Sequence, residues 1–137
     1  MKFLIDTNVI AELRKGARAN RHVRFWFAAL DPGAILISVL TIGEIRRGIE
    51  SVRRRDAAAA RALERWLRTI LDEYSEQILP VEVEVAEEWG RMNVPDPVPV
   101  IDGLLAATAK VHGLTFATRN VKDVSRTGIQ VFNPFEA

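Results

Sequence analysis

Five side chains that could bind a metal ion or a phosphate lie far apart in the sequence: Asp6, Glu44, Asp102, Asn120 and Asp123. Each of them falls at, or one helical turn past, the expected end of a buried strand. Carboxylates gathered at one place repel one another and raise one another's pKa unless a cation neutralises them. Mg²⁺ prefers oxygen ligands, retains several waters and recruits substrate phosphates, and Mn²⁺ suits the same ligands. The set therefore indicates a metal site that could activate a water for in-line attack on a phosphate ester.

Each of these side chains also has a purely structural interpretation. Asp6 could be the N-cap of the helix that follows it, and Asp102 could cap a later helix. Thr41 and Glu44 fit the spacing of a capping box, in which the glutamate reaches back to the backbone of the cap. Asn120 belongs to a polar turn of ordinary composition. Only the shared position at strand ends favours the metal site over these separate explanations.

Short apolar runs that alternate with helical patterns would bring these groups together. Four runs and a weaker fifth predict strands, at residues 2–5, 35–38, 78–81, 114–117 and 129–132. Apolar residues at helical spacing predict helices over residues 22–30, 56–71 and 102–112, the last ended by Gly113. This alternation is typical of an α/β sandwich with a central, mainly parallel sheet of five strands. Ligands of such sheets bind beyond the carboxyl ends of the strands, where the five side chains are expected.

Length and composition indicate one globular domain over residues 1–137. The chain has 137 residues, of which 48% are hydrophobic and 27% charged, which suits a single hydrophobic core. The absence of cysteine excludes disulfides and thiolate metal sites, and is consistent with a reducing cytoplasm. The first apolar run is too short for a signal peptide or a membrane span. A cytoplasmic protein without membrane association is the expectation.

Charge is segregated along the chain although the net charge is only +1. Residues 12–24 carry five basic side chains and one acid, and residues 44–72 carry eight arginines and five acids. Residues 76–96 reverse the balance, with six acids and one arginine. Such segregation could give a basic face for phosphates, but arginines at helical spacing also simply solvate a helix. Both interpretations stay open for Arg46 and Arg47.

Four segments of the chain resemble, in order and spacing, the signatures of PIN-domain ribonuclease toxins of the VapC and FitB group. They are residues 1–10, 38–49, 101–109 and 114–123, and the ending at residues 132–136 is also similar to FitB-like chains. The resemblance covers essentially the whole length. It implies a PIN-like α/β/α sandwich and Mg²⁺-dependent hydrolysis of RNA phosphodiester bonds, with the 3′-hydroxyl as leaving group. It also implies the toxin role in a type II toxin–antitoxin pair.

The same resemblance implies roles for individual residues. Asp6 and Asp102 match the principal Mg²⁺ ligands, and Glu44 would complete the site directly or through water. Many family members have aspartate where this chain has Asn120, so whether Asn120 or Asp123 completes the site stays open. Supporting positions around the metal fall on Thr7, Asn8 and Thr118. Contacts with RNA or a partner fall on Arg46, Arg47 and Arg119.

The family also implies partners. A small antitoxin that blocks the acidic site and binds operator DNA is expected, as is a homodimer formed through the helices of the first half. Phe25, off the apolar stripe of its own helix, is a candidate contact in that dimer. One alternative is a phosphatase with Asp6 as covalent nucleophile, although Asn8 occupies the position of its usual partner aspartate. The other alternative is a non-catalytic module that binds RNA or protein, which Asn120 favours.

Overall fold

One sheet of five parallel strands forms the centre of the protein in a computed structural model that describes residues 1–136. The strands are β1 (Phe3–Ile5), β2 (Ile35–Ser38), β3 (Ile78–Leu79), β4 (Thr115–Ala117) and β5 (Val131–Phe132). Their order across the sheet is β3-β2-β1-β4-β5. All four neighbouring pairs are parallel, which confirms the predicted sheet and its strand positions.

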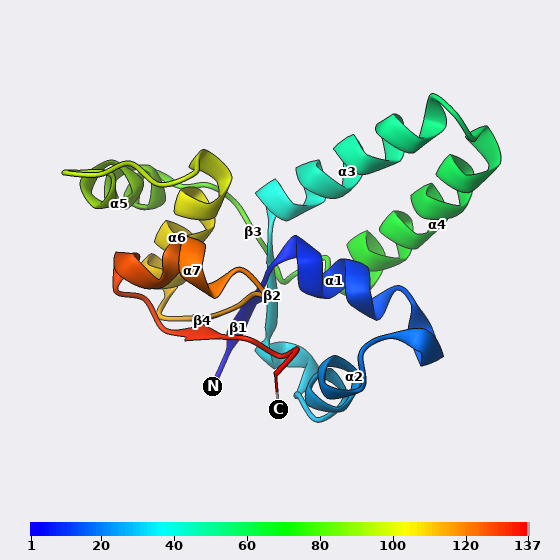
Figure 1. The fold of residues 1–137 in the computed structure, drawn as a ribbon, viewed down its shortest axis with the longest axis horizontal. Helices are drawn as coiled ribbons and strands as arrows, with labels where there is room; N and C mark the ends of the chain where they lie inside the picture. The colour runs from blue at the N-terminus through cyan, green and yellow to red at the C-terminus, as the bar shows by residue number, and fades with distance from the viewer. Residues whose placement is uncertain (137) are drawn as a thin grey trace.

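Helices cover both faces of this sheet (Figure 1). They are α1 (Thr7–Leu13), α2 (Arg21–Ala28), α3 (Val39–Arg53), α4 (Ala57–Glu73), α5 (Val83–Met92), α6 (Val100–His112) and α7 (Val121–Val124). Helices α3 and α4 lie side by side and extend away from the sheet, whereas α5, α6 and α7 gather on the opposite side of the molecule (Figure 1). No helix within residues 1–136 is long and apolar enough to cross a membrane.

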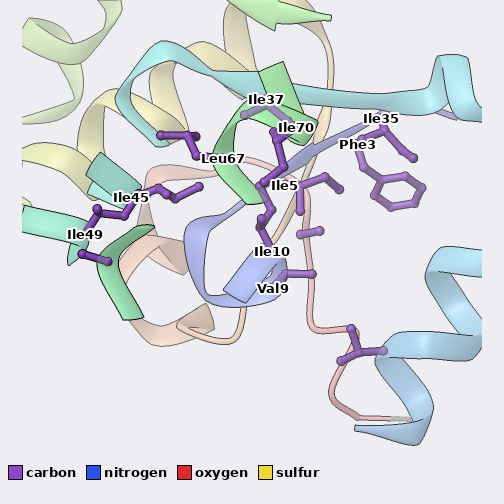
Figure 2. Close-up of a cluster of buried hydrophobic side chains, with 13 residues drawn as sticks. Phe3, Ile5, Val9, Ile10, Ile35, Ile37, Ile45, Ile49, Leu67 and Ile70 are labelled. Atoms are coloured by element: carbon purple, nitrogen blue, oxygen red, sulfur yellow. The ribbon is translucent and has the colours of Figure 1, made fainter. Parts of the chain in front are cut away.

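Alternate residues of each strand supply two separate cores. Phe3 and Ile5 belong to the cluster formed with α1 to α4, shown in Figure 2. Leu4, which lies between them, belongs to a second cluster with Leu105 of α6 and Phe116 of β4. Successive strand side chains point to opposite faces, so a continuously apolar strand must be covered on both. The three-layer arrangement therefore follows from the apolar runs of the sequence.

Two helices begin earlier than the sequence patterns suggest, and this excludes two structural interpretations. Helix α3 begins at Val39, with the Ser38 hydroxyl accepting a hydrogen bond from Leu40 N–H at 3.0 Å. Thr41 therefore lies inside the helix, and the proposed capping box with Glu44 is wrong. Helix α6 begins at Val100 after a proline, so Asp102 lies in its first turn and is not its cap. Because α6 follows α5, the expectation that every candidate lies at the end of a strand is wrong for Asp102. Ser38 was missed because serine and threonine share the same preference for caps.

Substitution of Ser38 and of Thr41 is expected to affect stability in opposite ways. Ser38→Ala removes the hydrogen bond that caps α3 and should lower the free energy of unfolding by roughly 0.5–2 kcal/mol. The Thr41 side chain is buried, and its hydroxyl has no hydrogen-bond partner within residues 1–136. Thr41→Val keeps the shape and removes this unpaired group, so stability should stay equal or rise by about 1 kcal/mol. Urea unfolding of both variants measures the difference, and a destabilised Thr41→Val would contradict this account.

The order of the strands places a crevice beside β1. From β1 the chain moves to β2 and β3 on one side, and then crosses to β4 and β5 on the other. Open parallel sheets bind ligands at such a reversal, outside the carboxyl ends of the two strands that flank it. Those two ends are followed by Asp6, after β1, and by Thr118, after β4.

Candidate functional site

Asp6 stands at the reversal point, and both of its carboxylate oxygens are hydrogen-bonded. Oδ1 accepts from Thr7 N–H at 2.8 Å, so Asp6 is the N-cap of α1, one of the two roles considered for it. Oδ2 accepts from the Thr118 hydroxyl at 2.7 Å and from Asn8 Nδ2 at 3.1 Å. The side chain is only 5% exposed. A carboxylate held by three donors is fixed in orientation, which a simple cap does not require.

The turn after β4 is bound to the start of α1 by the same group of side chains. Thr118 Oγ1 accepts from Asn120 N–H at 3.0 Å while it donates to Asp6. Asn8 Oδ1 accepts from Arg119 N–H at 3.2 Å. Asn8 also donates to Asp6. The turn is therefore connected to the Asp6 carboxylate directly by Thr118 and, from Arg119, through Asn8. The structure thus places Asn8 and Thr118 around Asp6.

Glu44 approaches the site from the second turn of α3. Its Oε1 accepts a hydrogen bond from the Thr7 hydroxyl at 2.6 Å. Thr7 therefore connects Glu44 to Asp6, because its backbone N–H donates to Asp6 and its hydroxyl donates to Glu44. This contact orients Glu44 toward the start of α1, where the expected metal ligands lie.

The charges of neighbouring carboxylates act on Asp102. Burial raises the pKa of Asp102 above its ordinary value, and the charges of Asp6, Asp123 and Glu44 raise it further. Burial also raises the pKa of Asp6, against the opposing effect of the hydrogen bonds from Thr118 and from Thr7 N–H. Like charges raise a neighbour's pKa only when they lie close to it. The four carboxylates, from four separate segments, therefore share one local field.

The structure distinguishes the two candidates after β4. Asn120 occupies the N-cap position of α7, but its side chain makes no capping hydrogen bond and is exposed. Asp123 lies in the first turn of the same helix, and its charge, after that of Asp6, is one of three that raise the pKa of Asp102. Of the two, Asp123 adds negative charge to the cluster, and Asn120 offers an uncharged amide beside it.

The donor set suits a hard cation that keeps part of its water shell. Within residues 1–136, none of the four carboxylates forms an ion pair with lysine, arginine or histidine, so their charge is not balanced by the protein. In the same part of the chain, no three acidic, histidine or cysteine side chains come close enough to enclose an ion by themselves. Mg²⁺ is commonly bound by one or two carboxylates, with waters and substrate phosphates as its other ligands. An open site of this kind fits Mg²⁺ better than a closed cage.

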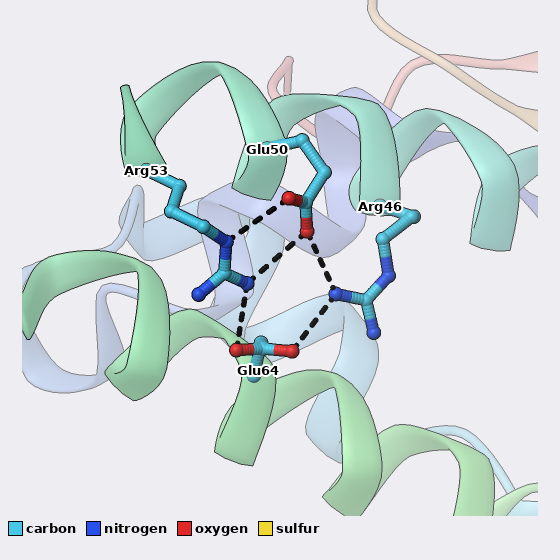
Figure 3. A network of polar contacts seen from close by, with 4 residues as sticks. All are labelled: Arg46, Glu50, Arg53 and Glu64. Carbon is cyan, nitrogen blue, oxygen red and sulfur yellow. Dashed lines mark hydrogen bonds and ion pairs between the residues drawn. The ribbon is translucent and has the colours of Figure 1, made fainter. Parts of the chain in front are cut away.

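Arg46 and Arg47 of α3 have different surroundings. Arg46 is paired with Glu50 at 3.2 Å and with Glu64 of α4 at 3.0 Å, and Arg53 joins the same two glutamates (Figure 3). These contacts connect α3 to α4 and occupy Arg46. Arg47 instead lines a shallow hollow beside Glu44. Of the pair, Arg47 is the one placed next to the acidic site.

A parallel five-stranded sheet with a carboxylate at its point of reversal defines an α/β protein with a candidate metal site, and the comparison with known families is specific. The sequence profile of the PIN domain matches residues 3–129, and the chain belongs to this family. The recognition of a PIN domain and of its α/β sandwich from the sequence is thereby confirmed.

Individual relatives are similar over nearly their whole length. The toxin FitB of Neisseria gonorrhoeae is 31% identical over 138 residues, covering 96% of this chain and 97% of FitB. The VapC ribonuclease Y4jK of Sinorhizobium fredii is 28% identical, covering 97% of each chain. Among solved structures, FitAcB from Neisseria gonorrhoeae superposes with a TM-score of 0.90 at 30% identity, over 98% of this chain and 99% of that chain. FitAB bound to an IR36 DNA fragment gives a TM-score of 0.88 at 28% identity, over 98% and 96%.

Proposed function

We propose that this chain is a Mg²⁺-dependent endoribonuclease and the toxin of a type II toxin–antitoxin pair. One observation carries the proposal: Thr7 joins Asp6 and Glu44 beyond the carboxyl ends of β1 and β2. Among residues 1–136, no basic side chain pairs with these two carboxylates or with Asp102 and Asp123. A protein that only folds gains nothing from such an arrangement, since burial and neighbouring charge raise the energy of ionised Asp6 and Asp102. Membership of the PIN family and similarity to a VapC ribonuclease support the same chemistry.

Asp6 and Asp102 would hold the ion, and Glu44 and Asp123 would complete its negative surroundings. A bound Mg²⁺ supplies activation of a water and neutralisation of the charge that builds up on the attacked phosphate. Thr7, Asn8 and Thr118 fix Asp6, so the ligand is already oriented before RNA arrives. Without a cation, the clustered acids repel the phosphates of RNA. Binding of RNA at the site and binding of the metal are therefore coupled.

Metal removal tests this proposal directly. The purified chain is incubated with end-labelled single-stranded RNA in EDTA, and then after addition of Mg²⁺ or Mn²⁺. Cleavage should be undetectable in EDTA, should return with either ion, and should leave 3′-hydroxyl and 5′-phosphate ends. Mapping those ends on total RNA would also reveal the target. Cleavage that persists in EDTA, or RNA that is bound with metal but never cut, would contradict the enzymatic proposal.

A non-catalytic module that binds RNA or protein is the second candidate. Asn120 favours it, because an amide replaces the fourth carboxylate found in many members of the family. The position of Asp123 weakens this argument, since that residue supplies a charge that Asp102 senses. Metal titration separates the two functions, because a binding module has no RNA turnover to couple to Mg²⁺.

A small antitoxin and operator DNA are the proposed partners. The similar solved structures include FitAB bound to a DNA fragment, which supports a complex of the same kind here. An antitoxin that inserts a basic side chain between the four carboxylates would neutralise them as the metal does. We also propose a homodimer through the helices of the first half, where Phe25 is 63% exposed. Light scattering after size-exclusion chromatography measures the dimer, and a monomer at micromolar concentration would contradict it.

A further inference from the structure

The side chain of Arg119 is supported by an aromatic ring from the end of the chain. Its guanidinium carbon lies 4.5 Å from the centre of the Phe135 ring. The ring is fixed in turn, because Phe135 packs against the core of α1 to α4 and its N–H donates to Asn133 Oδ1 at 2.9 Å. Arg119 is exposed and is not ion-paired within residues 1–136. The nearby Glu12 is already paired with Lys15 at 2.9 Å.

This arrangement leaves a flat cationic group at the surface. An arginine that is free in solution samples many conformations, whereas one that is stacked on a ring presents its planar face in a defined direction. Arg119 is exposed, so its side chain remains accessible to a ligand while it contacts Phe135. Splayed bases of single-stranded RNA stack on such guanidinium planes.

A hollow of about 530 Å³ lies beside this platform and is lined by both Arg119 and Asp123. Its other lining residues are Asn120, Val121, Lys122, Asn133 and Glu136, so two acids stand beside the arginine and the lysine. Its volume falls in the range of roughly 300–1,000 Å³ that is typical of ligand pockets. Asn120, which lines the hollow, donates its backbone N–H to Thr118 Oγ1 at 3.0 Å, and the Thr118 hydroxyl donates to Asp6 at 2.7 Å. The hollow is therefore joined to Asp6 through two hydrogen bonds, on the side of the site where β4 ends.

The lining combines groups that suit one nucleotide. Lys122 is exposed and forms no ion pair within the described chain, so it is available to a phosphate. The Asn120 amide caps nothing and offers both a donor and an acceptor to a base edge. An acidic peptide has no flat ring to stack on Arg119, and an apolar segment would leave Lys122 and Asn120 without partners. A nucleotide satisfies the flat cation, the amide and the lysine together.

We propose that this hollow binds the nucleotide next to the scissile phosphate of a single-stranded RNA, with its base stacked on Arg119. The inference rests on the proposed nuclease function and adds a position at which the substrate is recognised. Arg119 supplies the stacking surface, Phe135 holds it flat, and Lys122 contacts the adjoining phosphate. Bases of all kinds can stack, so the site holds one base without selecting its identity.

An abasic scan tests the stacking contact without requiring cleavage. The full chain carrying Asp102→Asn is titrated, in Mg²⁺, with fluorescein-labelled nine-nucleotide RNAs in which each position in turn lacks its base. With Arg119 present, one position should show a loss of affinity of about tenfold, as expected for one stacked base. In the additional variant Arg119→Ala, or Phe135→Leu, the same position should change affinity by less than about twofold. The exposed Arg54, at the tip of the α3–α4 hairpin, gives the control Arg54→Ala, which should keep the tenfold step.

The outcomes separate this inference from the nuclease proposal. A flat abasic scan with the Arg119-containing protein would overturn the nucleotide site, even if the wild-type chain cleaves RNA in Mg²⁺. The nucleotide site would also be overturned if Arg119→Ala and Arg54→Ala lowered RNA affinity equally and both kept the tenfold loss at one abasic position. Arg119 would then contribute only its positive charge. If the abasic scan shows the expected position but the wild-type chain never cleaves RNA in Mg²⁺, the nucleotide site is supported and the enzymatic proposal is rejected. Unchanged RNA affinity in Arg119→Ala, with loss of a protein partner, would assign the hollow to that partner instead.

Discussion

Asp102→Asn is expected to lower Mg²⁺-dependent RNA cleavage by about a thousandfold, because it removes a carboxylate that contributes several kcal/mol through the metal. The same substitution should raise the thermal stability of the metal-free protein. Burial and the charges of Asp6, Asp123 and Glu44 raise the pKa of Asp102, so the ionised form is unfavourable in the folded state. Asparagine keeps the shape and removes the charge. Activity and stability should therefore move in opposite directions.

The size of the stability gain from Asp102→Asn depends on pH. The pKa of Asp102 is higher in the folded protein than in the unfolded chain, so the folded state binds the proton more tightly. Stability of the wild type is then lost as pH rises through the folded pKa. In EDTA, the gain from Asp102→Asn should be present at neutral pH and disappear below about pH 4, where the carboxyl is protonated in both states. Thermal unfolding at the two pH values measures it.

A matched control is available on α4. Asp72 is exposed and forms no ion pair within residues 1–136. Asp72→Asn should therefore leave both cleavage and thermal stability unchanged. Full Mg²⁺-dependent activity in Asp102→Asn would reject the assignment of the metal ligand. Loss of activity together with a lower melting temperature would show structural damage instead, and would contradict the expected opposition of the two effects.

The strands and the site region could be predicted because their signals are local. A parallel strand is apolar on both faces, so the continuous apolar run Phe3, Leu4 and Ile5 predicts β1 without knowledge of the strands that pair with it. The reversal of strand order then brings Asp6 next to Thr118, 112 residues away, although nothing in the sequence around either residue indicates the other. The sequence predicts that polar groups gather at one edge of the sheet. Which of these groups are in contact depends on the strand order, which the sequence does not indicate.

Contacts between helices could not be predicted in the same way. Whether Arg46 is free or paired depends on the register of α3 against α4, which places Glu64 within 3.0 Å. Basic spacing along α3 is compatible with either outcome. Likewise, Phe135 lies under Arg119 only because the chain returns along β5 beside β4. Contacts that depend on long-range packing leave no periodic pattern in the sequence. Basic spacing alone is therefore compatible with both interpretations of these arginines.

Gly103→Ala is expected to destabilise the protein, although alanine normally favours a helix over glycine. A Cβ at Gly103 would lie 2.6 Å from Val98 Cγ2 and 3.1 Å from Trp89 Cδ1. Val98 is buried and its N–H donates to Asn93 Oδ1 at 2.9 Å, so it has little freedom to move. Overpacking of this kind costs roughly 1–3 kcal/mol, against a gain of about 1 kcal/mol from helix propensity. The net expectation is a loss of about 1 kcal/mol or more.

Gly48→Ala gives the control, because the same change on α3 meets open space. No heavy atom lies within 4 Å of a Cβ at Gly48, and its backbone is helical. Its substitution should raise the free energy of unfolding by roughly 0.5–1 kcal/mol. Urea unfolding of the two variants should therefore give effects of opposite sign. A stabilised Gly103→Ala would show that the segment before α6 yields easily.

The clash at Gly103 also bears on catalysis, because Asp102 is the preceding residue of the same helical turn. Relief of the contacts shifts α6 relative to Val98, in the segment before it, and to Trp89 of α5, and Asp102 moves with the helix. Displacement of a catalytic group by about 1 Å can cost on the order of a hundredfold in rate. Cleavage by Gly103→Ala should consequently fall about ten- to a hundredfold at a temperature where the variant is still folded, while Gly48→Ala cleaves normally. Normal cleavage by a destabilised Gly103→Ala would mean that Asp102 keeps its place independently of how closely α5 and α6 pack.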